Sequence, residues 1–128
     1  MLGFDPIEVA ILLYPGVQMA VVLGLSDLLN FADDLGRKKA GSPDNPALHV
    51  THWQRDEEGE LYRTFGAAPG VSGKPTVAVV PPAWGDPISR AAAQPYAQWL
   101  RERHASGTVL SSVCSGAGSV AKIGGSQR

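Results

Sequence analysis

The chain has 128 residues, which is enough for one hydrophobic core of modest size and too few for two. Its 11 lysines and arginines nearly balance 12 aspartates and glutamates, so bulk charge does not indicate binding to nucleic acid or to an anionic membrane. The single cysteine, Cys114, excludes an intrachain disulfide and favours a reducing cytoplasm. The apolar run 7–25 is interrupted by Glu8 and the turn Pro15-Gly16, so neither half can cross a bilayer, and no signal-peptide pattern precedes it.

The first strand and helix are predicted from the apolar pattern. Residues 7–13 are apolar almost throughout and stop at the turn 14–16, as expected for a strand buried on both faces of a parallel sheet. Apolar residues then recur at helical spacing over 19–35, so we expect a helix that ends at Gly36. The basic cluster 37–39 suits the carboxyl end of that helix, where positive charge stabilises the helix dipole.

Strand composition returns in residues 48–54, which contain two histidines. His49 and His52 are three positions apart, so on a strand their side chains point to opposite faces of the sheet. No cysteine or carboxylate stands at ligand spacing nearby, and we therefore expect no metal site. Residues 56–59 predict a turn, and residues 60–65 a short returning strand.

The second half of the chain predicts a strand, a helix and another strand. Residues 76–80 form a β-branched run with a proline-rich loop at its carboxyl end. Helical spacing covers 87–104, where Pro95 is expected to kink or split the helix and to open a second segment. The next apolar, β-branched run is 108–113, which ends at Cys114.

Cys114 has the sequence surroundings of a nucleophile elbow. A sharp turn from a strand into a helix strains the backbone and requires small neighbours, and both Ser112 and Gly116 are small. The amino end of a following helix would also lower the pKa of the thiol. The alternative is a structural cysteine at the end of a core strand, since free cysteines are among the most buried residues.

Buried strands that alternate with helical stretches predict an α/β fold with a parallel sheet. Ligands of such sheets bind beyond the carboxyl ends of the strands. Three loops are therefore expected to converge there: residues 14–18, 81–86 and 114–116. This position favours the interpretation of Cys114 as a site residue, active or vestigial.

Four segments together resemble the ThiJ/PfpI family of the class I glutamine amidotransferase-like superfamily. They are Leu-Leu-Tyr-Pro-Gly-Val-Gln-Met at 12–19, Val-Val-Pro-Pro at 79–82, Trp-Leu-Arg-Glu-Arg-His-Ala-Ser-Gly-Thr-Val-Leu at 99–110 and Ser-Val-Cys-Ser-Gly-Ala at 112–117. The combination is most similar to the amino-terminal domain of GlxA-type, AraC-family transcriptional regulators, and it covers residues 7–117. The resemblance implies a flavodoxin-like three-layer sandwich with a mostly parallel sheet.

The resemblance also allows the catalytic groups of the family's enzymes to be compared with the residues of this chain. Enzymes of the family pair the elbow cysteine with an acidic residue five positions after the turn glycine, and Val21 occupies that position here. They often carry Gly-Gly after the strand proline, where this chain has Pro82 and Ala83, and proline has no N–H to offer an oxyanion. A family histidine beyond the following helix has no counterpart before Arg128. These departures favour a sensing pocket over an enzyme.

We therefore expect a non-catalytic ligand-sensing and dimerisation domain of a transcriptional regulator whose helix-turn-helix part is absent from this chain. The expected partners are an unidentified small molecule and a second copy of the chain, with no cofactor, no metal, no membrane and no direct contact with nucleic acid. The alternatives are a small cysteine-dependent hydrolase, isonitrile hydratase or glyoxalase-like enzyme that uses Cys114, and an inactive remnant. The expected ligand contacts around Cys114 are Tyr14, Val21, Ala83, Trp84, Ser115 and Gly116.

The carboxyl-terminal residues depart from the family pattern. Residues 118–128 are rich in glycine and serine and have only Val120 and Ile123 as sizeable apolar side chains. We expect a partial ThiJ/PfpI-like domain over residues 1–117 and a divergent, frayed tail over residues 118–128. The fold is thus expected to be incomplete at this end relative to the family, so the domain would be marginally stable or would be completed by dimerisation.

Overall fold

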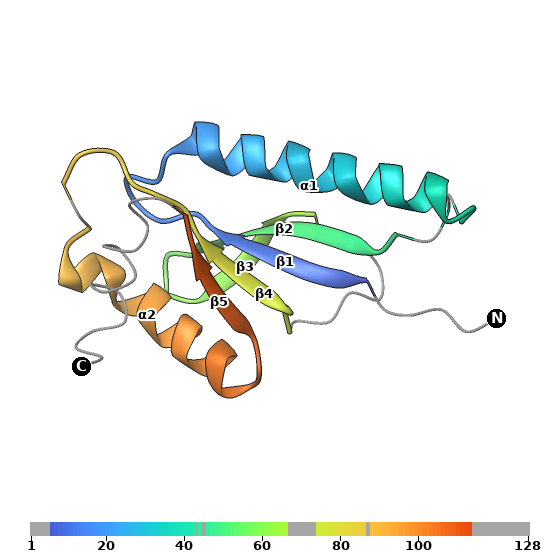
Figure 1. The fold of residues 1–128 in the computed structure, drawn as a ribbon. Helices are drawn as coiled ribbons and strands as arrows, with labels where there is room; N and C mark the ends of the chain where they lie inside the picture. Colours follow the sequence, from blue (N-terminus) through green and yellow to red (C-terminus); the bar gives the residue numbers. More distant parts are fainter. Residues whose placement is uncertain (1–5, 43, 45, 67–73, 87, 114–128) are drawn as a thin grey trace.

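A computed structural model describes residues 6–42, 44, 46–66, 74–86 and 88–113. The elements of these residues are β1 (Ile7–Leu12), α1 (Met19–Lys39), β2 (Leu48–Arg55), β3 (Leu61–Phe65), β4 (Val77–Val80), α2 (Arg90–Ala105) and β5 (Val109–Ser112). The strands form one sheet, with α1 on one face and α2 on the other (Figure 1). The fold is therefore the predicted α/β fold, with a mostly parallel sheet and the layers of a flavodoxin-like sandwich.

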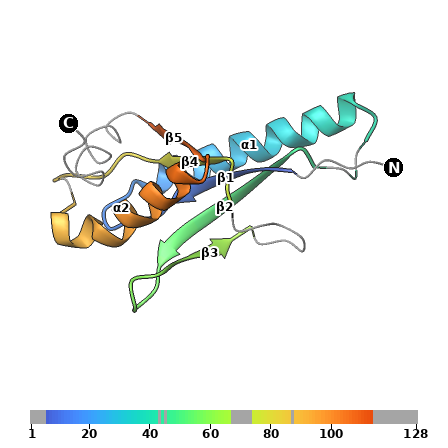
Figure 2. The same cartoon turned by 90° about the horizontal axis from the view of Figure 1, so that it is seen from below.

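The sheet is parallel except at one edge. Its strand order is β3-β2-β1-β4-β5, and β1 runs parallel to both β2 and β4, while β4 runs parallel to β5. Only β3 is antiparallel, because it returns along β2 after a turn at residues 56–59 (Figure 2). The carboxyl ends of the four parallel strands consequently lie at the same edge of the sheet, at the left of Figure 1.

Helix α1 continues past Gly36, where the apolar spacing predicted its end, to Lys39. A glycine inside a helix costs about 1 kcal/mol relative to alanine, so the last turn needs other support. Asp34 provides it through ion pairs with Arg37 at 3.6 Å and with Lys38 at 3.0 Å. The basic residues of the last turn also lie at the negative end of the helix dipole, as expected.

Helix α2 is one helix, so the predicted division at Pro95 is wrong, and it begins at Arg90, three residues after the predicted start. Its start is capped by Ser89, whose hydroxyl accepts a hydrogen bond from the amide of Ala92 at 3.1 Å. Pro95 removes only one backbone hydrogen bond, whereas the helix buries side chains on both sides of it. These buried residues are Ala93, Tyr96, Ala97, Trp99 and Leu100. Their packing outweighs the local cost of the proline.

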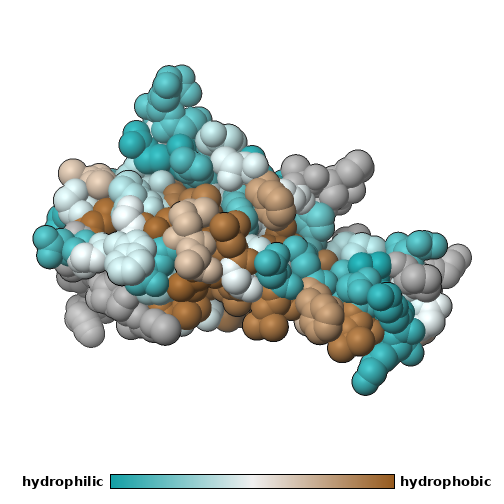
Figure 3. Space-filling view, turned by 90° about the horizontal axis from the view of Figure 1, so that it is seen from above, coloured by the Kyte–Doolittle hydropathy of each residue, from teal (hydrophilic) through white to brown (hydrophobic). Residues whose placement is uncertain are grey.

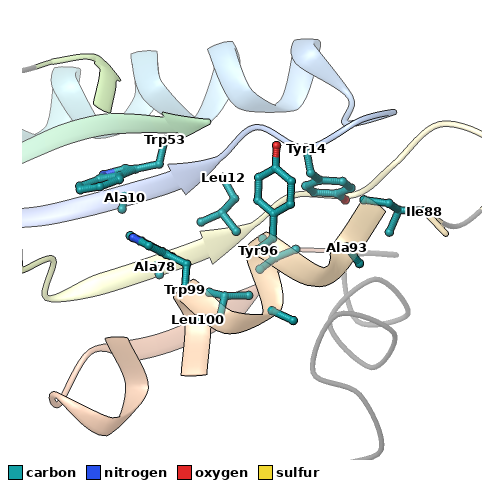
Figure 4. Close-up of a cluster of buried hydrophobic side chains, with 12 residues drawn as sticks. Ala10, Leu12, Tyr14, Trp53, Ala78, Ile88, Ala93, Tyr96, Trp99 and Leu100 are labelled. Atoms are coloured by element: carbon teal, nitrogen blue, oxygen red, sulfur yellow. The ribbon is translucent and has the colours of Figure 1, made fainter. Parts of the chain in front are cut away.

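Two apolar clusters, one on each face of the sheet, form the core. The cluster beneath α1 consists of Val9, Ile11, Val22, Val50 and Val79. The cluster beneath α2 contains the large aromatic side chains (Figure 4). In it the ring centroids of Trp53 and Trp99 are 5.0 Å apart, and Tyr14 meets Tyr96 edge to face at 6.3 Å. Alternate residues of β1 serve the two clusters, because successive side chains of a strand point to opposite faces.

A buried charge network around Glu8 attaches β3 to the rest of the sheet. Glu8 is 4 % exposed, and its carboxylate accepts two hydrogen bonds from Arg63, at 3.0 and 2.9 Å. Thr51 donates to the same carboxylate at 2.7 Å, and the indole of Trp53 donates at 3.3 Å. A carboxylate removed from water requires such partners. The network therefore joins β1, β2 and β3 in one register.

Replacement of Glu8 by alanine would leave Arg63 without its buried partner. We expect Glu8→Ala to lower the free energy of unfolding by about 3 kcal/mol, because removal of one member of a buried ion pair leaves the other charge uncompensated. Urea unfolding followed by circular dichroism measures this loss. Glu60→Ala, at an exposed position of the adjacent turn, is the control. Equal losses in the two variants would show that the network does not hold β3.

Candidate functional site

The loops that follow β1 and β4 are hydrogen-bonded to each other at the carboxyl edge of the sheet. The amide of Gln18 donates to the carbonyl of Pro82 at 2.9 Å, and the amide of Trp84 donates to the carbonyl of Gly16 at 2.7 Å. We call these four residues and their two hydrogen bonds the loop clasp. Two of the three loops that were predicted to converge therefore do lie together.

Tyr14 joins the same two loops from the interior. Its side chain is 3 % exposed, and its hydroxyl donates to the carbonyl of Pro81. The ring of Tyr96 packs against it, and the hydroxyl of Tyr96 donates to the carbonyl of Leu13 at 2.9 Å. Burial raises the pKa of Tyr96, an effect that Arg55 offsets only in part, so this hydroxyl stays protonated near neutral pH. Both hydroxyls thus act as structural donors.

The other predicted contact residues of these loops differ in their exposure. Val21 is partly buried in the first turn of α1. Ala83 is also partly buried, and it forms an isolated antiparallel bridge with Val17. Trp84 is 72 % exposed, although its backbone belongs to the loop clasp. A side chain this exposed is free to contact a ligand or a partner.

The predicted elbow lies outside the described residues, and it comprises Cys114, Ser115 and Gly116. The last described residue before it is Val113, whose amide donates to the carbonyl of Val80 at 3.2 Å. The strand ahead of Cys114 therefore ends beside β4, at the edge of the sheet where the loop clasp lies.

A cavity of about 950 Å³ opens beside the loop clasp, on the side of β2 and β3. The described residues that line it are Leu13, Tyr14, Pro15, Gly16, Val17, Met19, Gln54, Arg55, Asp56, Glu57, Glu58, Tyr62 and Tyr96. Among the predicted contact residues that the structure describes, Tyr14 is the one in this lining. The sequence pattern predicts the turn after β2 but does not place it at the site, because the position of this turn beside the cavity depends on the antiparallel return of β3.

Acidic side chains outnumber basic ones around the cavity. Asp56, Glu57 and Glu58 bring carboxylates to the lining, against the guanidinium of Arg55. One oxygen of Asp56 accepts hydrogen bonds from the amides of Glu58 and Glu60, both at 2.9 Å, which fixes the turn. The surplus of negative charge favours a ligand with a positively charged group. The nearby tyrosine rings suit such a cation as well as an apolar body.

The two histidines of β2 do not form a metal site. His52 is buried on the α1 side of the sheet, while Nε2 of His49 is hydrogen-bonded to the carbonyl of Gly66. The predicted separation of their side chains is therefore confirmed. Within the residues that the structure describes, no group of three or more histidine, cysteine, aspartate or glutamate side chains is placed to hold a metal ion.

Ser26 and His52 form a buried pair that the sequence patterns did not identify. Their Oγ and Nε2 atoms are 2.7 Å apart, as in a serine activated by histidine. However, the hydroxyl of Ser26 donates to the carbonyl of Val22 at 2.7 Å, so Nε2 of His52 must donate to Ser26. A protonated Nε2 cannot accept the serine proton. The pair therefore links α1 to β2 and does not activate a nucleophile.

The buried imidazole should make stability depend on pH. Burial lowers the pKa of His52 below its ordinary value of 6.5. Between the folded pKa and pH 6.5 the unfolded chain binds more protons than the folded chain, so the stabilisation is complete above pH 6.5 and is lost as the pH falls below that value. Urea unfolding at about pH 7.5 and about pH 5.5 measures the loss. His52→Gln should reduce this dependence, and an unchanged dependence would contradict the assignment to His52.

Comparison with known proteins leaves the chain without an assigned family. No protein-family model matches it, and no curated protein matches it. Within the described ranges, neither α1 nor α2 combines the length and the apolar composition that a membrane crossing requires.

Proposed function

We propose that the chain is a non-catalytic ligand-binding and dimerisation domain, of the kind found in the GlxA-type, AraC-family regulators that it resembles. The observation that carries the proposal is the cavity beside the loop clasp, at the carboxyl edge of a parallel sheet, where ligands of such folds bind. The two described helices are separated by strands, so neither belongs to a helix-turn-helix. DNA recognition is therefore assigned to a unit outside the described residues.

The cavity suits a small organic molecule with a positive charge. Its volume of about 950 Å³ is within the range of ligand pockets in proteins. The tyrosine rings and the apolar side chains of Leu13 and Met19 can cover an apolar body, and the carboxylates of Glu57 and Glu58 can approach a cationic group. The ligand class proposed is thus an amine that carries an aromatic or aliphatic group.

Three observations favour sensing over catalysis. The described lining contains tyrosines and carboxylates but no histidine, serine or cysteine that could act as a nucleophile with its base. The hydroxyls of Tyr14 and Tyr96 already donate to backbone carbonyls. Val21 occupies the position at which the enzymes that the chain resembles carry an acid.

Thermal unfolding with a matched pair of probes tests the ligand site. Benzylamine, which is positively charged near neutral pH, should stabilise the chain by about 1.4 kcal/mol at ten times its Kd, whereas benzoate should not. Tyr62→Ala should remove the stabilisation, because this ring lines the cavity. Trp84→Ala should preserve it, because this exposed ring lies outside the lining. The reverse response of the two variants, or the absence of any stabilisation, would contradict a site in the cavity.

A cysteine-dependent enzyme is the second candidate, because Cys114 comes two positions after the end of β5, a strand that pairs with β4. The rate of alkylation by iodoacetamide, measured against pH, gives the pKa of its thiol. We expect a thiol pKa of about 8.5, the ordinary value of a free cysteine, and no turnover of methylglyoxal or isonitriles. A thiol pKa below about 7 together with turnover that Cys114→Ser abolishes would overturn the non-catalytic function.

A further inference from the structure

Helix α1 carries a second apolar face that no described part of the chain covers. Leu28 is 62 % exposed, Phe31 64 % and Leu35 45 %. Figure 3 looks onto this side of the molecule and shows hydrophobic surface along it, with hydrophilic surface towards one end. Large apolar side chains that are exposed together typically mark an interaction surface.

The spacing of these residues is that of a helix–helix contact. Gly24, Leu28, Phe31 and Leu35 follow one another at intervals of four, three and four positions, the a and d spacing of a heptad. Val22 faces the sheet, and Phe31 is nine positions later, which is about 180° around the helix. The four residues therefore form a seam, here called the outer seam, that points away from the core of the chain.

We propose that the outer seam packs against the outer seam of a second copy, with the two α1 helices antiparallel about a twofold axis between Leu28 and Phe31. This inference rests on dimerisation, which is part of the proposed function, and it adds the surface through which the two copies associate. A twofold contact of this kind is self-complementary, so Leu28 of one copy meets Phe31 of the other. The proposed occupant is therefore one molecule of the same chain, and the charge and the side-chain sizes along the outer seam are the observations that support it.

Charge selects the antiparallel arrangement. The last turn of α1 carries Arg37, Lys38 and Lys39. Ion pairs with Asp33 and Asp34 offset part of this charge, so three basic and two acidic residues leave a net charge of +1 at this end. Parallel helices would bring two such positive ends together, and like charges at close range are destabilising. Antiparallel helices separate the clusters by the length of the helix, which for its 21 residues is about 30 Å. That distance exceeds the Debye length of about 10 Å at moderate salt.

Size complementarity points to the same arrangement. With the twofold axis between Leu28 and Phe31, Gly24 of one copy lies opposite Leu35 of the other. A side chain added at Gly24 would meet no atom within 4 Å, so this part of the seam is open space. A glycine here costs about 1 kcal/mol of helix stability relative to alanine. The dimer gives this glycine a function, because the absence of a side chain leaves room for Leu35 of the second copy.

Sedimentation velocity on the whole chain tests the inference. We expect a dimer whose Kd rises by about 100-fold or more in Leu28→Glu/Phe31→Glu, because the dimer would bury the new charges. Both side chains are mostly exposed, so circular dichroism should show an unchanged fold. Leu23→Glu is the matched control, since Leu23 is 53 % exposed but outside the outer seam, and it should leave the dimer intact. A monomeric wild-type chain, or a dimer that resists the double substitution, would overturn the inference.

Disulfide cross-linking tests the direction of the helices. In a Cys114→Ser background, Gly24→Cys/Leu35→Cys should cross-link two copies, whereas Gly24→Cys alone should not. Cross-linking by Gly24→Cys alone would indicate parallel helices and contradict the proposed arrangement. The failure of the ligand proposal is a separate result, because a dimer can form without any response to benzylamine, and benzylamine can stabilise a monomer.

Discussion

The candidate site depends on the hydrogen bonds of the loop clasp. Four parallel strands end at one edge of the sheet, where the backbone groups of the following loops no longer have ladder partners. The bonds between Gln18 and Pro82 and between Trp84 and Gly16 satisfy some of these groups within the chain. The carbonyl oxygen of Ala83 accepts a further bond from the side chain of Gln18 at 3.4 Å. The space between β1 and β4, where doubly wound sheets usually bind ligands, is thereby spanned by backbone pairing.

This pairing explains why the cavity lies to one side of the predicted position. The loop clasp holds the amino end of α1 against the end of β4, and Tyr14 and Tyr96 fill the space beneath it. The open volume is found instead between the first loop and the β2–β3 turn. The Glu8 network matters for the same reason, since it fixes β3 and therefore the position of Tyr62. A structural ion pair between β1 and β3 thus helps to define a pocket that the neighbouring Tyr62 lines.

The apolar pattern of the sequence predicts the α/β class and most of the strands, because buried parallel strands are apolar on both faces and end at prolines or glycines. The pattern does not predict the features of the fold that depend on contacts between residues far apart in the sequence. Pro95 does not divide α2, since packing on the sheet outweighs one lost hydrogen bond. Arg63 pairs with Glu8 across 55 positions, and no local pattern reveals such a partner. The cavity lining was not predicted either, because its residues come from segments that are far apart in the sequence. The convergence of the first two loops, in contrast, followed from strand direction alone.

Amide hydrogen exchange at Gln18 and Trp84 tests the central claim most directly, because these two N–H groups form the loop clasp. If the clasp is a fixed part of the fold, both amides should exchange as slowly as amides in the core of β1, and nearly only through global unfolding. The nearby amide of Gly85 has no such bond in the clasp and serves as the internal reference for a loop. Exchange of Gln18 and Trp84 as fast as that reference would contradict a site organised by paired loops.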